Sequence, residues 1–334
     1  MTLTLDELPD ALLIVSFGGP AGPDEVMPFL QRVTGGRVPE SRLAEVSDRY
    51  ATVGGRSPIV DAQNDLVEAV RVHLAAEGPE LPVYLATRNW EPNLFDAMTQ
   101  MRDDGVKRAL AFVTSAFSSY AGCRAYLDAI MAAWSEVEGA PRIDKLRGFW
   151  NHPLFLETVR MRIEEVLPDA PARLLFTAHS LPVPMADACA YEEQLRAAAA
   201  LLSADLGGMP WDLCWQSRSG HPSQPWLEPD ICDALEGMAG ETRAVVVVPL
   251  GFVADHMEVV WDLDVEARAK ADALGLTMVR ARTAGTHPTF VRMVGDLVRE
   301  RWGADRPTRG RLPALPDVCP AGCCPPGATA RPRG

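Results

Sequence analysis

Three acidic residues recur at every fourth position in the segment GFVADHMEVVWDLDVEAR (251–268). They are Glu258, Asp262 and Glu266. Residues at this spacing share one face of a helix, where like charges repel one another and destabilise the helix slightly. A row of carboxylates next to His256 is suited to relaying protons or divalent metal ions. The alternative is a solvated helix face that begins with a capping box formed by Asp255 and Glu258.

A second histidine stands at the end of another apolar run. His179 closes RLLFTAH (173–179), where a parallel strand would end. Neutral imidazole accepts a proton and also binds divalent metals. Ligands of open α/β sheets bind at the carboxyl ends of strands. A lone histidine is also compatible with a structural role, but a base at one strand end and acids after another favour metal or proton chemistry.

Short apolar runs separated by longer amphipathic stretches must position these residues. We predict buried strands at 11–17, 81–87, 108–117, 173–179, 211–217 and 243–252. Amphipathic helices are predicted over 62–78 and 192–207, among others. This alternation indicates an α/β fold with parallel sheets covered by helices. The runs that start at Arg108 and Arg243 resemble internal copies, which favours two similar lobes meeting at a cleft.

The composition is that of a globular protein with a sizeable core. The 334 residues are 47% apolar and 23% charged, enough for one large domain or two ordinary ones. A net charge of −13 and a pI near 5.0 argue against nucleic acid or an anionic membrane surface as partner. The N-terminus lacks the basic region of a signal peptide, and the most apolar run, 244–254, is too short for a transmembrane segment. We therefore expect a cytoplasmic protein whose seven cysteines are thiols or metal ligands.

The segment 306–334 is rich in Pro and Gly, and its composition alone predicts disorder. It nevertheless contains Cys319, Cys323 and Cys324. A closed zinc or iron–sulfur site takes four ligands, so a fourth would come from the body of the chain. The candidates are Cys123, Cys189, Cys214 and Cys232. Cys123 follows a predicted strand and is the best placed, Cys214 is expected in the core, and free tail cysteines are the alternative.

The glycine pair in DRYATVGGRSPI (48–59) lies beside Arg56 and Ser57. Such a segment could bind phosphate or carboxylate, or be a plain turn. It lacks the lysine and the spacing of a P-loop, so we do not expect nucleotide binding.

The chain resembles the ferrochelatases, which insert ferrous iron into a porphyrin in haem synthesis. The resemblance covers nearly the whole chain and rests on five stretches in the family's order. These are LLIVSFGGP (12–20), RYATVGGRSPI (49–59), FTAHSLP (176–182), WQSRSGHPSQPWLEPD (215–230) and PLGFVADHMEVVWDLDVE (249–266). The resemblance implies two Rossmann-like, chelatase-type lobes around a porphyrin cleft. Lobe 1 would span 1–150, with a helix at about 286–304 packed on it, lobe 2 would span 151–285, and 305–334 would be the cysteine tail.

The resemblance also implies roles for particular residues. It places His179 and Glu258 at the family's catalytic histidine and glutamate, which would also bind the Fe²⁺ substrate. Asp262 and Glu266 would continue from them as a relay for protons or metal. The implied porphyrin contacts are Phe17, Arg49, Tyr50, Ser57 and Tyr126, with Arg32 and Arg37 as further partners for propionates. Phe17 and Asn89 replace a tyrosine and a histidine of some relatives, so a phenolate ligand and an outer metal site are not expected there.

A subset of the family carries a [2Fe–2S] cluster on three C-terminal cysteines and one internal cysteine. The tail cysteines of this chain resemble that set, which implies a cluster on Cys123, Cys319, Cys323 and Cys324.

The segment 20–37 is not strongly apolar, and members without an apolar membrane-binding lip are implied to use coproporphyrin III. We therefore expect conversion of coproporphyrin III to coproheme, with a protoporphyrin IX ferrochelatase as the alternative. A porphyrin- or haem-binding protein without activity and an iron–sulfur redox sensor are more distant alternatives. Transient contacts with other enzymes of haem synthesis are also implied.

Overall fold

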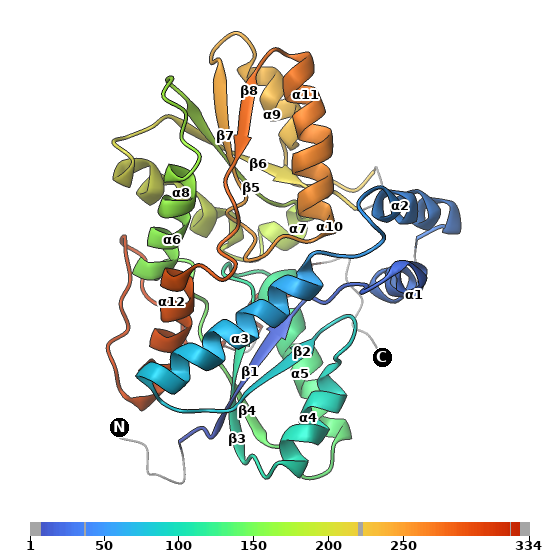
Figure 1. Cartoon of the computed structure of the whole chain (residues 1–334), viewed down its shortest axis with the longest axis vertical. Helices are drawn as coiled ribbons and strands as arrows, with labels where there is room; N and C mark the ends of the chain where they lie inside the picture. The colour runs from blue at the N-terminus through green and yellow to red at the C-terminus, as the bar shows by residue number, and fades with distance from the viewer. Residues whose placement is uncertain (1–7, 37, 220–222, 321, 328–334) are drawn as a thin grey trace.

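The computed structural model describes residues 8–36, 38–219, 223–320 and 322–327. These residues form two four-stranded parallel sheets flanked by helices, one above the other in Figure 1. The first sheet has the order β2-β1-β3-β4, with β1 Ala11–Ser16, β2 Val83–Thr87, β3 Arg108–Val113 and β4 Arg142–Lys145. The second has the order β6-β5-β7-β8, with β5 Arg173–His179, β6 Trp211–Gln216, β7 Ala244–Val248 and β8 Thr277–Arg280. We call each sheet with its helices lobe 1 and lobe 2, in chain order.

The two sheets have the same strand order when each is numbered from its own first strand. The strands predicted as internal copies, β3 and β7, therefore occupy equivalent places. The prediction of an α/β fold with two similar lobes is confirmed. Strands β4 and β8 were not predicted, because each has four residues and only one of their eight side chains is buried, so neither forms an apolar run.

Helices connect the strands within each lobe. Lobe 1 contains α1 Pro23–Thr34, α2 Glu40–Thr52, α3 Ile59–Glu77, α4 Leu94–Asp103, the π-helix η2 Tyr120–Arg124 and α5 Ala125–Glu136. Lobe 2 contains α6 Pro153–Glu164, α7 Val183–Ala186, α8 Tyr191–Asp205, α9 Ile231–Met238, α10 Met257–Val259, the π-helix η3 Val260–Ala267 and α11 Arg268–Ala273. The chain continues into α12 Pro288–Arg299 and the 3₁₀-helix η4 Glu300–Trp302. The predicted helices over 62–78 and 192–207 correspond to α3 and α8.

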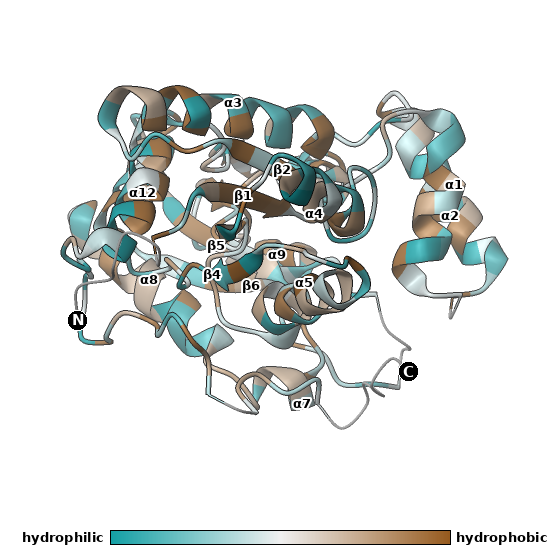
Figure 2. Ribbon diagram, turned by 90° about the horizontal axis from the view of Figure 1, so that it is seen from below, coloured by the Kyte–Doolittle hydropathy of each residue, from teal (hydrophilic) through white to brown (hydrophobic). Residues whose placement is uncertain are grey.

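The strands are buried on both faces, as expected for parallel sheets between helices. Alternate residues of β1 show this: Leu12 belongs to a core that also contains Phe176 of β5, whereas Leu13 packs on the opposite face. One apolar core therefore runs through both lobes, and α12 adds Phe290 to it while contacting α3 and α6. Figure 2 shows the apolar strands enclosed by helices with polar outer turns, and α1 and α2 set to one side. The lobe boundaries at 150 and 285 stay predictions.

The tail is ordered where the structure describes it, so the disorder predicted from its composition is wrong there. Asn151, which is fully buried, donates from Nδ2 to the carbonyls of Leu312 and Pro313. The side chain of Leu315 lies over Gly148, where a Cβ would come within 2.6 Å of Leu315 Cδ1. A segment without a core of its own is thus held by residues near the boundary between the two lobes.

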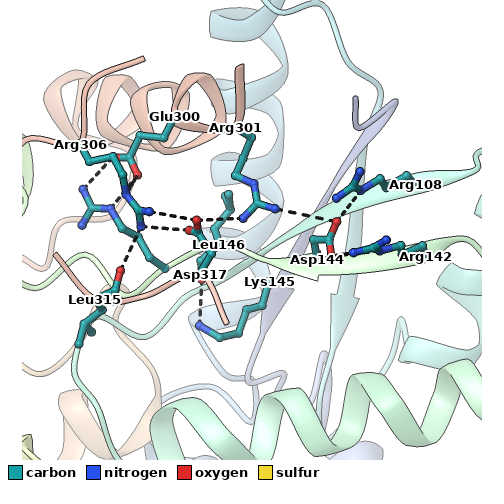
Figure 3. Close-up of polar contacts among 11 residues, drawn as sticks. Arg108, Arg142, Asp144, Lys145, Leu146, Glu300, Arg301, Arg306, Leu315 and Asp317 are labelled. Carbon is teal, nitrogen blue, oxygen red and sulfur yellow. Dashed lines mark hydrogen bonds and ion pairs between the residues drawn. The ribbon is translucent and has the colours of Figure 1, made fainter. Parts of the chain in front are cut away.

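Ion pairs also hold the tail (Figure 3). Asp317 accepts two hydrogen bonds of 3.1 Å from Arg306, and lies 3.3 Å from Arg301 Nη1. Arg306 Nη2 also donates to the carbonyl of Leu315. Glu300 forms a bidentate pair with Arg147 that is almost fully buried. These contacts fix the course of the tail just before its cysteines.

Candidate active site

His179 lies at the carboxyl end of β5, as predicted. Its Nδ1 is 2.6 Å from the carbonyl oxygen of Ser180. A carbonyl only accepts hydrogen bonds, so Nδ1 carries the proton in the neutral ring and Nε2 keeps a free lone pair. Tyr191 donates its hydroxyl to the carbonyl of His179, which fixes the backbone beside the ring.

Glu258 lies beside this imidazole. Its Oε2 is 3.8 Å from His179 Nε2 and also 3.8 Å from His256 Nδ1. Burial lowers the pKa of His256, although the charge of Glu258 opposes the shift, so His256 is neutral near pH 7. The carboxylate therefore stands between two imidazoles at the meeting point of two strand ends.

A close approach of β5 and the segment after β7 brings these side chains together. Gly251 donates its N–H to the carbonyl of Thr177 at 3.0 Å. A Cβ on Gly251 would lie 2.6 Å from the Cβ of Ala178. Only glycine allows this contact, which sets the position of the loop that leads to Glu258.

The capping box that was the structural alternative for Asp255 and Glu258 does not form. The N-cap of α10 is His256, and no side chain caps this helix. Asp255 instead pairs with Arg280 of β8. After one turn the helix continues as the π-helix η3, a form with i→i+5 hydrogen bonds that is frequent at functional sites.

The acid row leads from Glu258 into lobe 2. Asp262 is 8% exposed, and its Oδ2 accepts hydrogen bonds from Ser217 Oγ at 2.5 Å and Gln216 Nε2 at 3.3 Å. Burial raises the pKa of Asp262 to about 7, and the charges of Glu258 and Glu266 add to this, against the Ser217 hydrogen bond. Asp262 can therefore gain or lose a proton near neutral pH.

Glu266 is held from lobe 1. It accepts a hydrogen bond of 2.7 Å from Trp261 Nε1 and lies 3.5 Å from Arg49 Nη2. The guanidinium carbon of Arg49 is also 5.0 Å from the centre of the Trp261 ring. Helix α2 of lobe 1 thus reaches across to η3 of lobe 2.

An apolar cluster of α1 and α2 accompanies that contact. Tyr50 is buried in it together with Phe29 and Met257, and Phe17 packs against it. Burial raises the pKa of Tyr50, and the nearby charge of Glu258 raises it further, so its hydroxyl stays protonated. Of the predicted porphyrin contacts, Phe17, Arg49 and Tyr50 therefore lie near the His179–Glu258 site.

The other predicted porphyrin contacts are enclosed or engaged elsewhere. Tyr126 and Ser57 are 4% and 2% exposed, so neither side chain is open to a ligand in this conformation. Arg88 lies over the ring of Tyr126, and Arg32 lies 3.6 Å from Glu91. Arg37 is outside the described residues. Asn89, at the position of the absent histidine, is buried and donates from Nδ2 to the carbonyl of Phe17.

The four cysteines predicted as cluster ligands form a continuous series of contacts. The Cys123 and Cys319 thiols are hydrogen-bonded, which lowers the pKa of Cys319 to about 7 and raises that of Cys123. Cys319 also contacts Cys323, whose Sγ is 3.6 Å from that of Cys324. The Cys189 thiol donates a hydrogen bond to the carbonyl of Met185 and also lies near Cys323. Among the described residues, no three His, Cys, Asp or Glu side chains are placed to hold a single metal ion.

Comparison with known proteins shows to which family the chain belongs. A family model described as ferrochelatase matches residues 9–302. The chain belongs to the ferrochelatase family. A ferrochelatase from Rhodopirellula baltica is 47% identical, over 98% of this chain and 99% of the relative. The coproporphyrin III ferrochelatase of Frankia alni is 48% identical, over 95% and 87%, and that of Streptomyces coelicolor is 45% identical, over 96% and 95%.

Solved structures support the fold assignment. SirB from Bacillus subtilis with Fe³⁺ superposes with a TM-score of 0.57 at 13% identity, over 89% of this chain and 98% of SirB. CbiX, described as the terminal enzyme of sirohaem biosynthesis in denitrifying bacteria, gives 0.50 at 16% identity, over 87% and 98%. At this level of identity the similarity shows only that this chain shares its fold with these two proteins. No helix in the described part of the chain has the length and apolar character needed to cross a membrane.

Several residues of the site were not predicted as functional. His256 was noted only for its place before the acid row, yet its ring contacts Glu258. Ser217 and Gln216, which hold Asp262, lie within a stretch that resembles the family, so that signal could have indicated them. Arg280 ends a short, weakly apolar strand and has no local signal in the sequence.

Proposed function

We propose that this ferrochelatase inserts Fe²⁺ into coproporphyrin III and forms coproheme, with His179 and Glu258 as its catalytic residues. The observation that carries the proposal is the position of Glu258, 3.8 Å from His179 and from His256 where two parallel strands end. The choice of porphyrin is supported by relatives named coproporphyrin III ferrochelatases at 45% identity or more over most of the chain.

Metal insertion requires that the porphyrin lose its two pyrrole protons and that Fe²⁺ lose its waters. His179 Nε2 is available to take a proton or to bind iron, because Nδ1–H is held by the Ser180 carbonyl. Glu258 accepts the proton in turn and offers oxygen ligands to the metal. Asp262, with its pKa near 7, passes protons onward to solvent through Glu266.

The four propionates of coproporphyrin III need cations and hydroxyls as partners. We propose contacts from Phe17, Arg49, Tyr50, Ser57 and Tyr126, as the family resemblance implies. Arg49 is the most accessible of the polar ones, with a 29% exposed side chain, and a propionate would replace Glu266 on it. Tyr126 and Ser57 would have to become exposed first. Transient contacts with other haem-synthesis enzymes also stay a prediction.

The relative turnover of two porphyrins tests this function. With Fe²⁺ and without oxygen, we expect kcat/KM for coproporphyrin III to exceed that for protoporphyrin IX by roughly tenfold or more, which is about 1.4 kcal/mol in the transition state. Absorbance of the metalloporphyrin gives the rate, and a reaction without iron is the control. A preference for protoporphyrin IX would contradict the choice of substrate. Stoichiometric binding without turnover would instead identify a porphyrin-binding protein.

We further propose that Cys123, Cys319, Cys323 and Cys324 hold a [2Fe–2S] cluster. Their contacts form two adjoining pairs, and a two-iron cluster takes two thiolates on each iron, whereas a single zinc needs four converging ligands. The anchors at Asn151 and Asp317 support this, because they hold the tail on the course that brings its cysteines to Cys123. When bound, the cluster would cross-link the tail to lobe 1.

Removal of the Cys123 thiol tests the cluster. Protein purified without oxygen is expected to be reddish, with two irons and two sulfides per chain. Cys123→Ser should lose this colour, whereas Cys214→Ser should keep it, since Cys214 is fully buried in β6. A colourless protein with one zinc would contradict the cluster. Loss of colour in Cys189→Ser but not in Cys123→Ser would contradict only the choice of fourth ligand.

A further inference from the structure

Arg280, the last residue of β8, lies between two carboxylates. Its Nε and Nη2 donate to the two oxygens of Asp264 at 2.6 and 2.8 Å. Its Nη1 and Nη2 donate to the two oxygens of Asp255 at 3.2 and 2.9 Å. The Arg280 side chain is 13% exposed, so this bridge is shielded from solvent far better than a surface ion pair.

The bridge joins two segments on either side of Glu258. Asp255 lies in the loop before α10, and Asp264 lies in η3 after it. Helix α10 has three residues and no side-chain cap, so its first turn receives little support from within the helix. The link from Asp255 to Arg280 provides an anchor at that point. Arg280 itself is fixed by pairing of β8 with β7.

The same region concentrates negative charge. Asp255, Glu258, Asp262, Asp264 and Glu266 all lie within residues 255–266. Their mutual repulsion opposes a compact helix. From β8, Arg280 compensates the charges of Asp255 and Asp264. From α2, Arg49 approaches Glu266. At the end of β6, Ser217 and Gln216 donate hydrogen bonds to Asp262. The π-helix is therefore fixed from three directions, and the contact from β8 is the one that pairs a single cation with two carboxylates.

Among the described residues, the side chains in contact with the Glu258 carboxylate are two histidines, each at 3.8 Å. At that distance neither is a hydrogen bond, so the backbone of α10 determines where the carboxylate lies. We propose that Arg280 is a positioning residue for metal insertion, which holds Glu258 against His179 by bridging Asp255 and Asp264. This inference rests on the proposed function and concerns the same site.

Arg280→Met tests the bridge, because it keeps an unbranched, flexible side chain close to the aliphatic part of arginine and removes the guanidinium. We expect kcat for metal insertion to fall roughly tenfold to 100-fold, the range in which small displacements of reacting groups act. Coproporphyrin III affinity, measured by fluorescence quenching, should stay within about twofold of wild type, because neither Arg280 nor its two aspartate partners are among the proposed porphyrin contacts.

Arg173→Met is the matched control. Arg173 begins β5 in the same sheet and is paired with Asp212 of the neighbouring strand, at the opposite end of the strand from His179. The Arg173→Met variant should have a lower Tm, because it loses an ion pair, and an unchanged kcat. A purely structural role for Arg280 would give the same result in both variants.

Two further variants secure the test. Arg280→Lys keeps one cation and should recover part of the lost kcat. Asp255→Asn keeps the Arg280–Asp264 pair, so it should fold even if Arg280→Met does not, and it should lower kcat without changing porphyrin affinity. Wild-type kcat in Asp255→Asn and in whichever Arg280 variant folds would overturn the inference while leaving the proposed function intact. Failure of the wild-type chain to form metalloporphyrin would reject the proposed function itself.

Discussion

We expect the His179→Ala variant to bind coproporphyrin III but to form metalloporphyrin at least about 10³-fold more slowly, since general acid–base groups alone contribute about 10²–10⁴-fold. The substitution removes the Nε2 lone pair that faces Glu258, and with it both a proton acceptor and a metal ligand. Quenching of porphyrin fluorescence measures the binding, and turnover with Fe²⁺ without oxygen measures the loss of rate.

His256→Ala is the matched control for this prediction. The His256 ring lies at the same distance of 3.8 Å from the same oxygen of Glu258, but its side chain is more buried, 20% against 32% exposed. Because the His256 side chain is more buried, we expect it to support Glu258 rather than to contact the substrate. Turnover should therefore fall less in His256→Ala than in His179→Ala. Near-normal turnover in His179→Ala would remove the assignment of His179 as base and ligand. Equal losses in the two variants would mean that both imidazoles act on the substrate.

The sequence predicts those parts of the fold whose signal is local. Continuous apolar runs mark β1 and β5 because strands of parallel sheets are buried on both faces. The short edge strands β4 and β8 carry no such signal, since their pairing with β3 and β7 determines them. The tail is the clearest case, because its order depends on Asn151 and Gly148, more than 150 residues earlier in the chain.

In the candidate site, too, the residues with a local sequence signal can be predicted and those fixed by distant contacts cannot. His179 and the acid row can be found from the sequence because they stand at strand ends and at regular spacing. The contacts that support them come from other elements of the fold: Ser217 after β6 reaches Asp262, and Arg280 of β8 reaches Asp255 and Asp264. The capping box fitted the local pattern, but Asp255 instead pairs with the partly buried Arg280. A guanidinium that is largely shielded from water strongly favours carboxylate partners, because an unpaired charge there would be far less stable.

We expect Glu258→Gln to lower kcat by about 10²–10⁴-fold and Glu266→Gln by less than about tenfold. The two substitutions are matched: each replaces a carboxylate by an amide of the same shape, and the side chains are 48% and 44% exposed. Their surroundings differ, because Glu258 lies between two imidazoles, whereas Glu266 is bound to Trp261 and Arg49. An amide at 258 can neither accept a proton nor supply an anionic ligand where the macrocycle must be deprotonated. An amide at 266 keeps an acceptor for Trp261 Nε1 and interrupts the relay only at its outer end, where water can take over.

Initial rates of metalloporphyrin formation across both variants measure the difference. Equally mild losses would show that the acid row is a solvated helix face, and equally severe losses would show that proton transfer along its whole length limits the rate.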